Sequence, residues 1–554
     1  MYLFGAKVPF EYRINHIKAI SAIKDAKMDL HLNLHSPLPD GGNLMTFIRP
    51  GKEPGRIIDL VSELPLSDKL TEYLPLSRVH VFSTQDESMS LSMFLFGERH
   101  TRAENVETSG EKFLAMANSI QQGKYDSSSR HPKPSEIFSK EPLLKYMRNC
   151  SESYLTRSDP RRFLLQRELV EQVTGSEGIA VYIEESEMDH TCGQYWVDIA
   201  VANSMPQVAL EHTSRLLYLH NFDVIRAHLD VVSDDENGDI ALVRLLVTPL
   251  EGEEVNKNKF SALKYDLKRS KWLDPFTMDL VMEKYPWLGI ERGEIITTCC
   301  SLMHPVMAKQ NSFIFSKANI LDTVTSERYI SHASSIADLF LSKFNPDRPL
   351  PKSLFDKRAN ELKLKIKSSV EDTFSIEMLY KMIDIVDKTL KTNIFLENRY
   401  ALGLRLDPIV MQSKDDEKVP PYGVFFVHGR RFNGFHVRFR EISRGGMRLV
   451  TPPSPEQFAL ESTRHYEECY GLAFAQQMKN KDIPEGGSKA VNLIDVNGIS
   501  EQKKNFVMRK SVKSFADTLL DLIVETKETS TKIIDLIGKK EVLYLGPDEQ
   551  VIQN

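Results

Sequence analysis

The chain has 554 residues, of which 41% are hydrophobic and 27% charged, and its formal net charge at pH 7 is −6. A chain of this length exceeds a single hydrophobic core, so several domains are expected. The composition is typical of globular proteins, and the acidic net charge argues against a dedicated nucleic-acid binder. No apolar run reaches the roughly 18 residues that a membrane-spanning helix needs, so no membrane partner is expected.

The cysteines and the N-terminal segment bear on compartment. The five cysteines are odd in number and form no CxxC pair, which fits a reducing compartment. The adjacent Cys299 and Cys300, with His304, do not match the spacing of a standard zinc site, so no metal is expected. Residues 1–24 are basic and mildly amphipathic, but they carry neither a secretory apolar segment nor a strong transit-peptide composition. We therefore expect a cytoplasmic protein or one of the mitochondrial matrix.

Residues 1–270 show one pattern twice. In residues 1–120, periodicity predicts strands over 44–49, 78–84 and 88–96 and a helix over 55–64. Residues 121–150, rich in Ser and Pro, predict a linker. In residues 151–270 the pattern returns, with strands over 178–184, 195–203, 222–232 and 240–248 and a helix from 204 to 220. Two β-α-β-β units of this length resemble ACT-like, ferredoxin-type modules, which often sense amino acids. A scaffold or oligomerisation surface is an equal alternative.

Residues 271–391 predict a mixed region followed by a helical connector. The prolines of the segment 345–351 interrupt regular structure, because proline lacks an N–H and restrains its predecessor. The charged stretch over residues 354–391 is strongly helical in pattern and predicts a connecting pair of helices.

Residues 392–554 predict an α/β domain. Alternation predicts strands over 399–407, 422–428 and 436–440. A helix should begin with Ser454 as N-cap and Pro455 at N1 and end near 479–481. A strand over 490–496, a helical stripe over 508–523 and a strand over 542–545 then predict a β-α-β unit with parallel pairing. The whole chain is thus expected to be multidomain, with α+β modules followed by an α/β domain.

A basic-aromatic cluster in this domain raises a nucleic-acid alternative. The cluster comprises Arg430, Arg431, Phe432, Phe435, Arg438 and Arg440. Because the acidic residues elsewhere are not segregated from it, we do not favour that function.

Two glycine pairs beside cations are the most informative feature of the sequence. Arg444-Gly445-Gly446 opens the first, and Lys489 closes the segment Gly486-Gly487-Ser488-Lys489. We expect both pairs to form turns, since glycine adopts positive φ and lets an anion approach the backbone. Lys479, at the end of the intervening helix, adds a further cation. Fixed positive charge of this kind suits a substrate with two carboxylates, although single lysines beside glycine turns are commonly just solvated.

The crowding of cations also suggests chemistry. A free lysine has a pKa of about 10.4, and neighbouring like charges with partial burial lower it towards the range of a useful base. Lys489 is the candidate for this role. Asp548 follows a predicted strand and the Gly546-Pro547 turn, where functional groups collect in α/β sheets.

Three separated motifs resemble the large NAD-dependent glutamate dehydrogenases of fungi, protists and bacteria, over about residues 392–549. They are Arg444-Gly445-Gly446-x-Arg448, Lys479 with Pro484-x-Gly486-Gly487-Ser488-Lys489, and Gly546-Pro547-Asp548. The resemblance implies a glutamate dehydrogenase-like substrate domain and the oxidative deamination of glutamate to 2-oxoglutarate and ammonia. It also implies NAD as the hydride acceptor and a homo-oligomer.

The resemblance also implies roles for single residues. Lys489 matches the catalytic lysine that activates water, and Asp548 matches the general acid/base. Lys479 matches a lysine that holds a substrate carboxylate. Arg444, with Gly445 and Gly446, falls where smaller relatives carry a lysine beside two glycines. An arginine fork there can bind a carboxylate through two hydrogen bonds.

One departure from the family concerns the cofactor. In the family a Rossmann domain follows the Pro-Asp motif, and this sequence has no G-x-G-x-x-G between a strand and a helix. We therefore expect the NAD-binding domain to be absent from this chain, which would be the substrate-binding half and an N-terminal regulatory region of the enzyme. The alternative is a non-catalytic amino-acid-sensing or assembly protein with a vestigial glutamate site.

Overall fold

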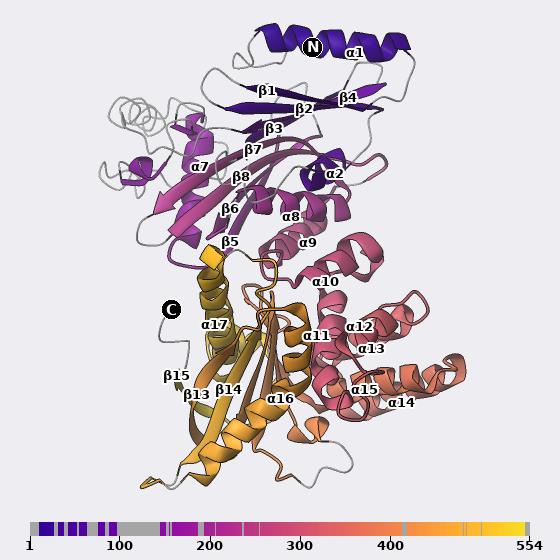
Figure 1. The fold of residues 1–554 in the computed structure, drawn as a ribbon, viewed down its shortest axis with the longest axis vertical. Coiled ribbons are helices and arrows are strands. Elements are labelled where there is room, and N and C mark those ends of the chain that lie inside the picture. The colour runs from indigo at the N-terminus through magenta and orange to yellow at the C-terminus, as the bar shows by residue number, and fades with distance from the viewer. Residues whose placement is uncertain are drawn as a thin grey trace. The chain divides into compact units, whose positions relative to one another are not determined.

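The computed structural model separates the chain into two compact units, Met1–Lys271 and Trp272–Asn554, and each is described by itself (Figure 1). The described residues are 10–26, 31–37, 42–51, 55–63, 76–83, 88–96, 145–150, 154–155, 158–186, 193–204, 206–234, 238–253, 255–412, 418–479, 481–483, 485–499 and 501–548. Most of the expected linker 121–150 lies outside these residues, as does Pro484 of the second motif.

The first unit is built on one antiparallel sheet of eight strands in the order β1-β2-β4-β3-β7-β8-β6-β5. Its elements are α1 (Phe10–Ala26), β1 (Leu32–Pro37), β2 (Asn43–Pro50), α2 (Arg56–Glu63), β3 (Leu76–Ser83), β4 (Met89–Phe96), α7 (Pro160–Val173), β5 (Ile179–Glu185), β6 (Tyr195–Ala202), α8 (Pro206–Leu219), β7 (Phe222–Asp234), β8 (Gly238–Pro249) and α9 (Lys257–Arg269). The strands and helices predicted in this region are confirmed to within a few residues.

The sheet order reveals an internal repeat. The segment β2-α2-β3-β4 has the strand order β2-β4-β3, and the segment β6-α8-β7-β8 has the matching order β6-β8-β7. In both halves a hairpin partner, β1 or β5, flanks the first strand and a helix, α1 or α7, precedes it. The halves join where β3 pairs with β7, with Val79 opposite Ala227. The two predicted β-α-β-β units are therefore present, but they share one continuous sheet.

The second unit combines a helical layer with a seven-stranded mixed sheet in the order β15-β13-β14-β12-β11-β10-β9 (Figure 1). Its elements are α10 (Pro275–Asp279), η3 (Leu280–Lys284), η4 (Pro286–Leu288), α11 (Ile290–Met307), α12 (Lys317–Val324), α13 (Ile330–Phe344), α14 (Lys352–Ser369), α15 (Thr373–Lys388), β9 (Thr389–Thr392), β10 (Leu402–Leu406), η5 (Pro408–Met411), β11 (Gly423–Gly429), β12 (Phe432–Arg438), β13 (Ile442–Val450), α16 (Pro455–Met478), β14 (Gly486–Ile494), α17 (Glu501–Ile523), α18 (Lys527–Lys532) and β15 (Val542–Pro547). The predicted connector is the pair α14 and α15.

Helices α16 and α17 cover opposite faces of this sheet. On β12, Phe435 packs edge-on against Tyr466 of α16, with ring centroids 5.3 Å apart. Its neighbour Gly434 faces the other way, because a Cβ there would lie 2.5 Å from Phe515 of α17. The Ser454 side chain accepts from the Gln457 N–H at 3.3 Å and Pro455 occupies N1, so the predicted start of α16 is confirmed.

Two expectations about the glycine pairs and their strands are corrected. Gly445 and Gly446 lie inside the interior strand β13, and Gly486 and Gly487 begin β14; none of the four has a positive φ. These four glycines do not form turns. They are strand residues at positions where a side chain would have little room. The strands β14 and β15 do not pair with each other, because β13 lies between them and pairs with both in parallel.

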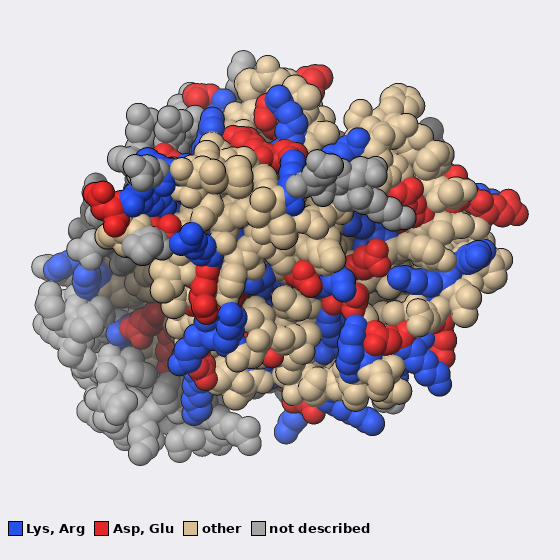
Figure 2. Space-filling view, turned by 90° about the horizontal axis from the view of Figure 1, so that it is seen from below, with Lys and Arg blue, Asp and Glu red and all other residues tan. Residues whose placement is uncertain are grey.

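The basic-aromatic cluster does not form a surface. Arg438 is fully buried and ion-paired with Glu541, and Phe432 and Phe435 are buried as well. On the face of the molecule shown in Figure 2, Lys and Arg side chains are interspersed with Asp and Glu. Neither observation favours nucleic-acid binding. Among the helices that the structure describes, none has the length and apolar character to cross a bilayer.

Candidate active site

Three parallel strands present the candidate site on the sheet face that α16 covers. Alternate residues of a strand point to the same side, and β13 pairs Gly446 with Lys489 of β14 and with Gly546 of β15. Arg444 lies two residues before Gly446 and therefore shares its face. Asp548 follows directly after β15. The motifs that sequence analysis found separately are thus neighbours in the sheet.

The central contact is an ion pair between Lys489 Nζ and Asp548 Oδ2. Lys489 is only 7% exposed, whereas the side chain of Asp548 is 36% exposed. The Asp548 N–H donates to the Met447 carbonyl at 3.1 Å, which fixes the carboxylate at the end of β15. An amine and a carboxylate held together in this way can exchange and relay protons with a ligand. The expectation that neighbouring cations lower the pKa of Lys489 stays a prediction.

Gly446 and Gly546 form a glycine floor beside this pair. A Cβ on Gly446 would lie 3.0 Å from Asp548 Oδ2, and a Cβ on Gly546 would meet only the Tyr544 ring, at 3.7 Å and beyond. The absence of a side chain at Gly446 lets the Asp548 carboxylate lie against the sheet surface next to Lys489.

The other glycines are required for packing. A Cβ on Gly445 would stand 1.8 Å from the Ser488 carbonyl oxygen, and one on Gly487 would stand 2.0 Å from the Gln477 nitrogen of α16. Both contacts are with backbone atoms, which cannot move aside as the end of a flexible side chain can. These glycines allow β13, β14 and α16 to approach closely enough to build the face.

We expect Gly445→Ala to lower the free energy of unfolding by about 1–3 kcal/mol, because the added methyl group forces β13 away from β14. Gly471→Ala, in the exposed middle of α16, is the matched control and should stabilise slightly. Urea titrations of both variants measure the difference. Equal stability of the two variants would contradict the close approach of the strands.

The carboxylate of Glu485, which sequence analysis missed, forms an ion pair with Arg444 at one end of the glycine floor. Arg444 Nη2 pairs with Glu485 Oε1 at 2.8 Å, and Lys481 Nζ lies 3.6 Å from the same oxygen. The side chain of Arg444 is 56% exposed and that of Glu485 is 13% exposed. The position of Glu485 directly before Gly486 was the available signal. Arg444 is thus held by an internal carboxylate in this structure.

Lys479 is not brought into contact with the other candidate residues. It is the exposed C-cap residue of α16, and the described part of the chain offers it no ion pair. The structure therefore unites Lys489, Asp548 and Gly446, places Arg444 on the same face and leaves Lys479 apart.

Two buried, uncharged side chains of α16 form hydrogen bonds to the backbone of β14 near Lys489. The Cys469 thiol of α16 donates to the Lys489 carbonyl at 3.3 Å, and burial raises the pKa of this thiol. The His465 ring donates from Nε2 to the Val491 carbonyl at 2.9 Å. Burial lowers the pKa of His465 to about 4, so the ring is neutral at pH 7. These bonds tie α16 to β14 without adding charge beneath the site.

The Cys299–His304 region of α11 serves packing. Both cysteines are buried, and burial raises the pKa of Cys299 to about 12. His304 lies 3.3 Å from the Ser462 hydroxyl through Nδ1. Within the described ranges, no group of three His, Cys, Asp or Glu side chains is placed to hold a metal ion.

Comparison with known proteins bears on the same region. Residues 363–543 match the catalytic domain of bacterial NAD-glutamate dehydrogenase. Over 173 residues the chain is 40% identical to an NAD-specific glutamate dehydrogenase of Saccharomyces cerevisiae, which covers 31% of this chain and 15% of that protein. Over 203 residues it is 38% identical to the NAD-specific glutamate dehydrogenase of Neurospora crassa, covering 36% and 18%. Over 190 residues it is 38% identical to glutamate dehydrogenase 2 of Dictyostelium discoideum, covering 34% and 17%.

The matched part is thus less than a fifth of each of these relatives. The family match over residues 363–543 includes α15 and strands β9 to β14 but only the first two residues of β15. The similarity therefore covers the strands that carry Arg444, Gly446 and Lys489. Over residues 363–543, this chain is similar to the catalytic domain of NAD-glutamate dehydrogenases.

Proposed function

We propose that the face around Lys489 and Asp548 is the substrate half of a glutamate dehydrogenase site. The reaction is the oxidative deamination of L-glutamate to 2-oxoglutarate and ammonia, with hydride passing to NAD. The observation that carries the proposal is the Lys489–Asp548 ion pair beside the glycine floor, in a segment similar to NAD-specific glutamate dehydrogenases. The similarity to enzymes favours this function over a non-catalytic sensing or assembly protein.

Each group has a task that its position supports. Lys489, buried and paired, activates the water that attacks the imine carbon, and Asp548, more exposed, moves protons to and from the amino group. Arg444 binds a substrate carboxylate once Glu485 releases it. Lys479 would hold the other carboxylate after moving towards the floor. NAD, which accepts the hydride when bound, would lie beside Gly546, where an added Cβ would approach only the Tyr544 ring.

Ligand specificity tests the proposal. We expect the chain to bind L-glutamate and 2-oxoglutarate weakly by calorimetry and to bind 2-oxobutanoate at least tenfold more weakly. The reason is that 2-oxobutanoate lacks the second carboxylate for which the cations are arranged. Equal affinities for 2-oxoglutarate and 2-oxobutanoate would argue against a dicarboxylate site.

Glu485→Gln should tighten the binding of 2-oxoglutarate. The substitution removes the internal carboxylate with which the ligand competes for Arg444. Because Arg444 is more than half exposed, the gain is at most about 1 kcal/mol, or about fivefold in Kd. Glu468→Gln, which frees Arg448 from a 3.2 Å ion pair further along β13, is the control and should leave Kd unchanged. Weaker binding by Glu485→Gln would mean that Glu485 itself helps to hold the ligand.

We further propose that the N-terminal unit is a pair of ACT-like modules. The repeated β-α-β-β topology within one sheet supports this, and such modules suit amino-acid sensing or oligomerisation. A homo-oligomer and a cytoplasmic or mitochondrial location stay predictions.

A further inference from the structure

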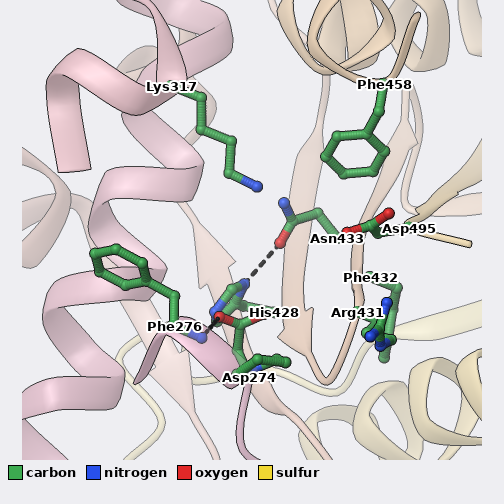
Figure 3. Close-up of a pocket in the computed structure, with 10 residues that line it drawn as sticks. Asp274, Phe276, Lys317, His428, Arg431, Phe432, Asn433, Phe458 and Asp495 are labelled. Carbon is green, nitrogen blue, oxygen red and sulfur yellow. Dashed lines mark hydrogen bonds between the residues drawn. The ribbon is translucent and has the colours of Figure 1, made fainter. Parts of the chain in front are cut away.

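A second cavity lies in the same unit, at the opposite end of β14 from the candidate active site (Figure 3). Its volume is about 270 Å³, and it is bounded by the turn between β11 and β12, the first turns of α12 and α16, and Asp495. Asp495, directly after β14, follows Lys489 by six residues, or about 20 Å at roughly 3.3 Å per residue. The cavity is therefore separate from the glycine floor.

Two hydrogen-bond donors point into this cavity. Lys317, at the start of α12, has no carboxylate within ion-pair distance among the described residues, and its ammonium lies 5.1 Å from the Phe458 ring centroid. Figure 3 shows the Lys317 ammonium and the amide nitrogen of Asn433 directed into the same space. An uncompensated ammonium beside an amide N–H donor is suited to a carboxylate.

His428 holds the Asn433 side chain on the same wall. His428 is 6% exposed, and its Nδ1 lies 2.7 Å from the amide oxygen of Asn433. Since that oxygen accepts, Nδ1 carries the proton and Nε2 is left as the acceptor. Nε2 is buried and has no hydrogen-bond partner. The bond from His428 to the Asn433 oxygen leaves the Asn433 amide nitrogen free to face the cavity.

Carboxylates complete the lining. Asp274 uses Oδ1 to accept from the Phe276 N–H at 3.0 Å, and Asp495 uses Oδ1 to accept from the Asn497 N–H at 3.0 Å. Each keeps its second oxygen for another donor. With Lys317 and Arg431 the cavity thus holds two cations and two anions. A lone anion or a lone cation would face a like charge there, whereas a molecule carrying both charges is matched.

We propose that this cavity binds a free α-amino acid with an apolar side chain. The carboxylate of the ligand lies on Lys317 and the amide nitrogen of Asn433, and its ammonium lies on a carboxylate of the lining, Asp274 or Asp495. The Phe458 ring, beside Lys317 and Asn433, receives the apolar side chain. The volume lies just below the roughly 300–1,000 Å³ of typical ligand pockets, which suits a molecule of amino-acid size and not a dinucleotide.

Three matched probes test the charge requirement by calorimetry on the whole chain. L-Phenylalanine carries both charges, 3-phenylpropanoate lacks the ammonium and 2-phenylethylamine lacks the carboxylate. We expect L-phenylalanine to bind at least tenfold more tightly than either of the others. Absent binding of L-phenylalanine overturns the proposal, and so does 3-phenylpropanoate binding as tightly, since that would indicate a simple anion site.

Substitutions inside and outside the cavity test whether L-phenylalanine binds there. Lys317→Gln should weaken L-phenylalanine binding at least tenfold, and Lys357→Gln, an exposed lysine of α14, should have no effect. If Lys317→Gln does not fold, Asp495→Asn takes its place with the same expectation. Lys489→Ala should leave L-phenylalanine binding unchanged, because that lysine belongs to the other site. Loss of L-phenylalanine binding in Lys489→Ala, or its retention in both cavity variants, contradicts the assignment.

Discussion

Replacing Lys489 by alanine is expected to abolish the binding of glutamate and 2-oxoglutarate. Lys489 is the buried cation of the site, and it lies beside Gly446 and is paired with Asp548. Removing one partner of a desolvated charge interaction costs about 2–5 kcal/mol, which corresponds to a loss in affinity of at least about thirtyfold. Calorimetry with 2-oxoglutarate measures the loss.

The fold should survive this substitution. Asp548, the partner left behind, has a side chain 36% exposed, so water can solvate the carboxylate. Thermal unfolding of Lys489→Ala should therefore stay close to that of the unaltered chain. Lys357→Ala, at an exposed position of α14, is the matched control for binding and should retain it. Unchanged affinity in folded Lys489→Ala would remove Lys489 from the site.

The largest effect on stability is expected from Glu541→Ala. Glu541 is buried, with a side chain 1% exposed, and its carboxylate lies between two buried guanidinium groups. Arg405 Nε approaches it at 2.9 Å, and Arg438 Nη2 contacts the same oxygen. Removal of the carboxylate leaves two like charges buried together, which costs about 3–5 kcal/mol.

The Glu541→Ala substitution is also expected to affect the candidate active site. Arg438 also donates to the Val542 carbonyl at 3.2 Å, at the start of β15, whose far end carries Asp548. We therefore expect Glu541→Ala to loosen β15 and to weaken 2-oxoglutarate binding as well as lowering the denaturant midpoint. Glu525→Ala is the control, because Glu525 forms an exposed ion pair with Lys540 that contributes little. A loss below about 1 kcal/mol for Glu541→Ala would contradict the importance of this buried cluster.

Sequence periodicity located most elements because amphipathic patterns are local. The strands around 44–49 and 222–232, the helix that begins at Pro455 and the connector helices all follow from spacing and capping. The strand β13 was missed because its Arg444-Gly445-Gly446 segment is rich in residues depleted from strands. Its strand character comes from its neighbours β14 and β15, which follow much later in the chain.

In the candidate active site, too, the sequence showed what depends on local motifs and not what depends on contacts between distant segments. The motifs identified Lys489, Asp548 and Arg444, and the structure brings the first two into contact. Sequence analysis did not find Glu485 on Arg444 or Glu541 on Arg405 and Arg438, because these pairings depend on strand register between distant segments. It also took the glycines for flexible turns. Their role at 445 and 487, where a neighbouring backbone leaves no room for a methyl group, becomes visible only in the packed sheet.

The most direct test of the central claim is a crystal structure of this chain with 2-oxoglutarate. The account predicts ligand density over Gly446 and Gly546, with one carboxylate on Arg444 in place of Glu485 and the keto carbon beside Lys489 and Asp548. Density elsewhere, with the glycine floor empty and the Arg444–Glu485 pair intact at a saturating concentration, would contradict it.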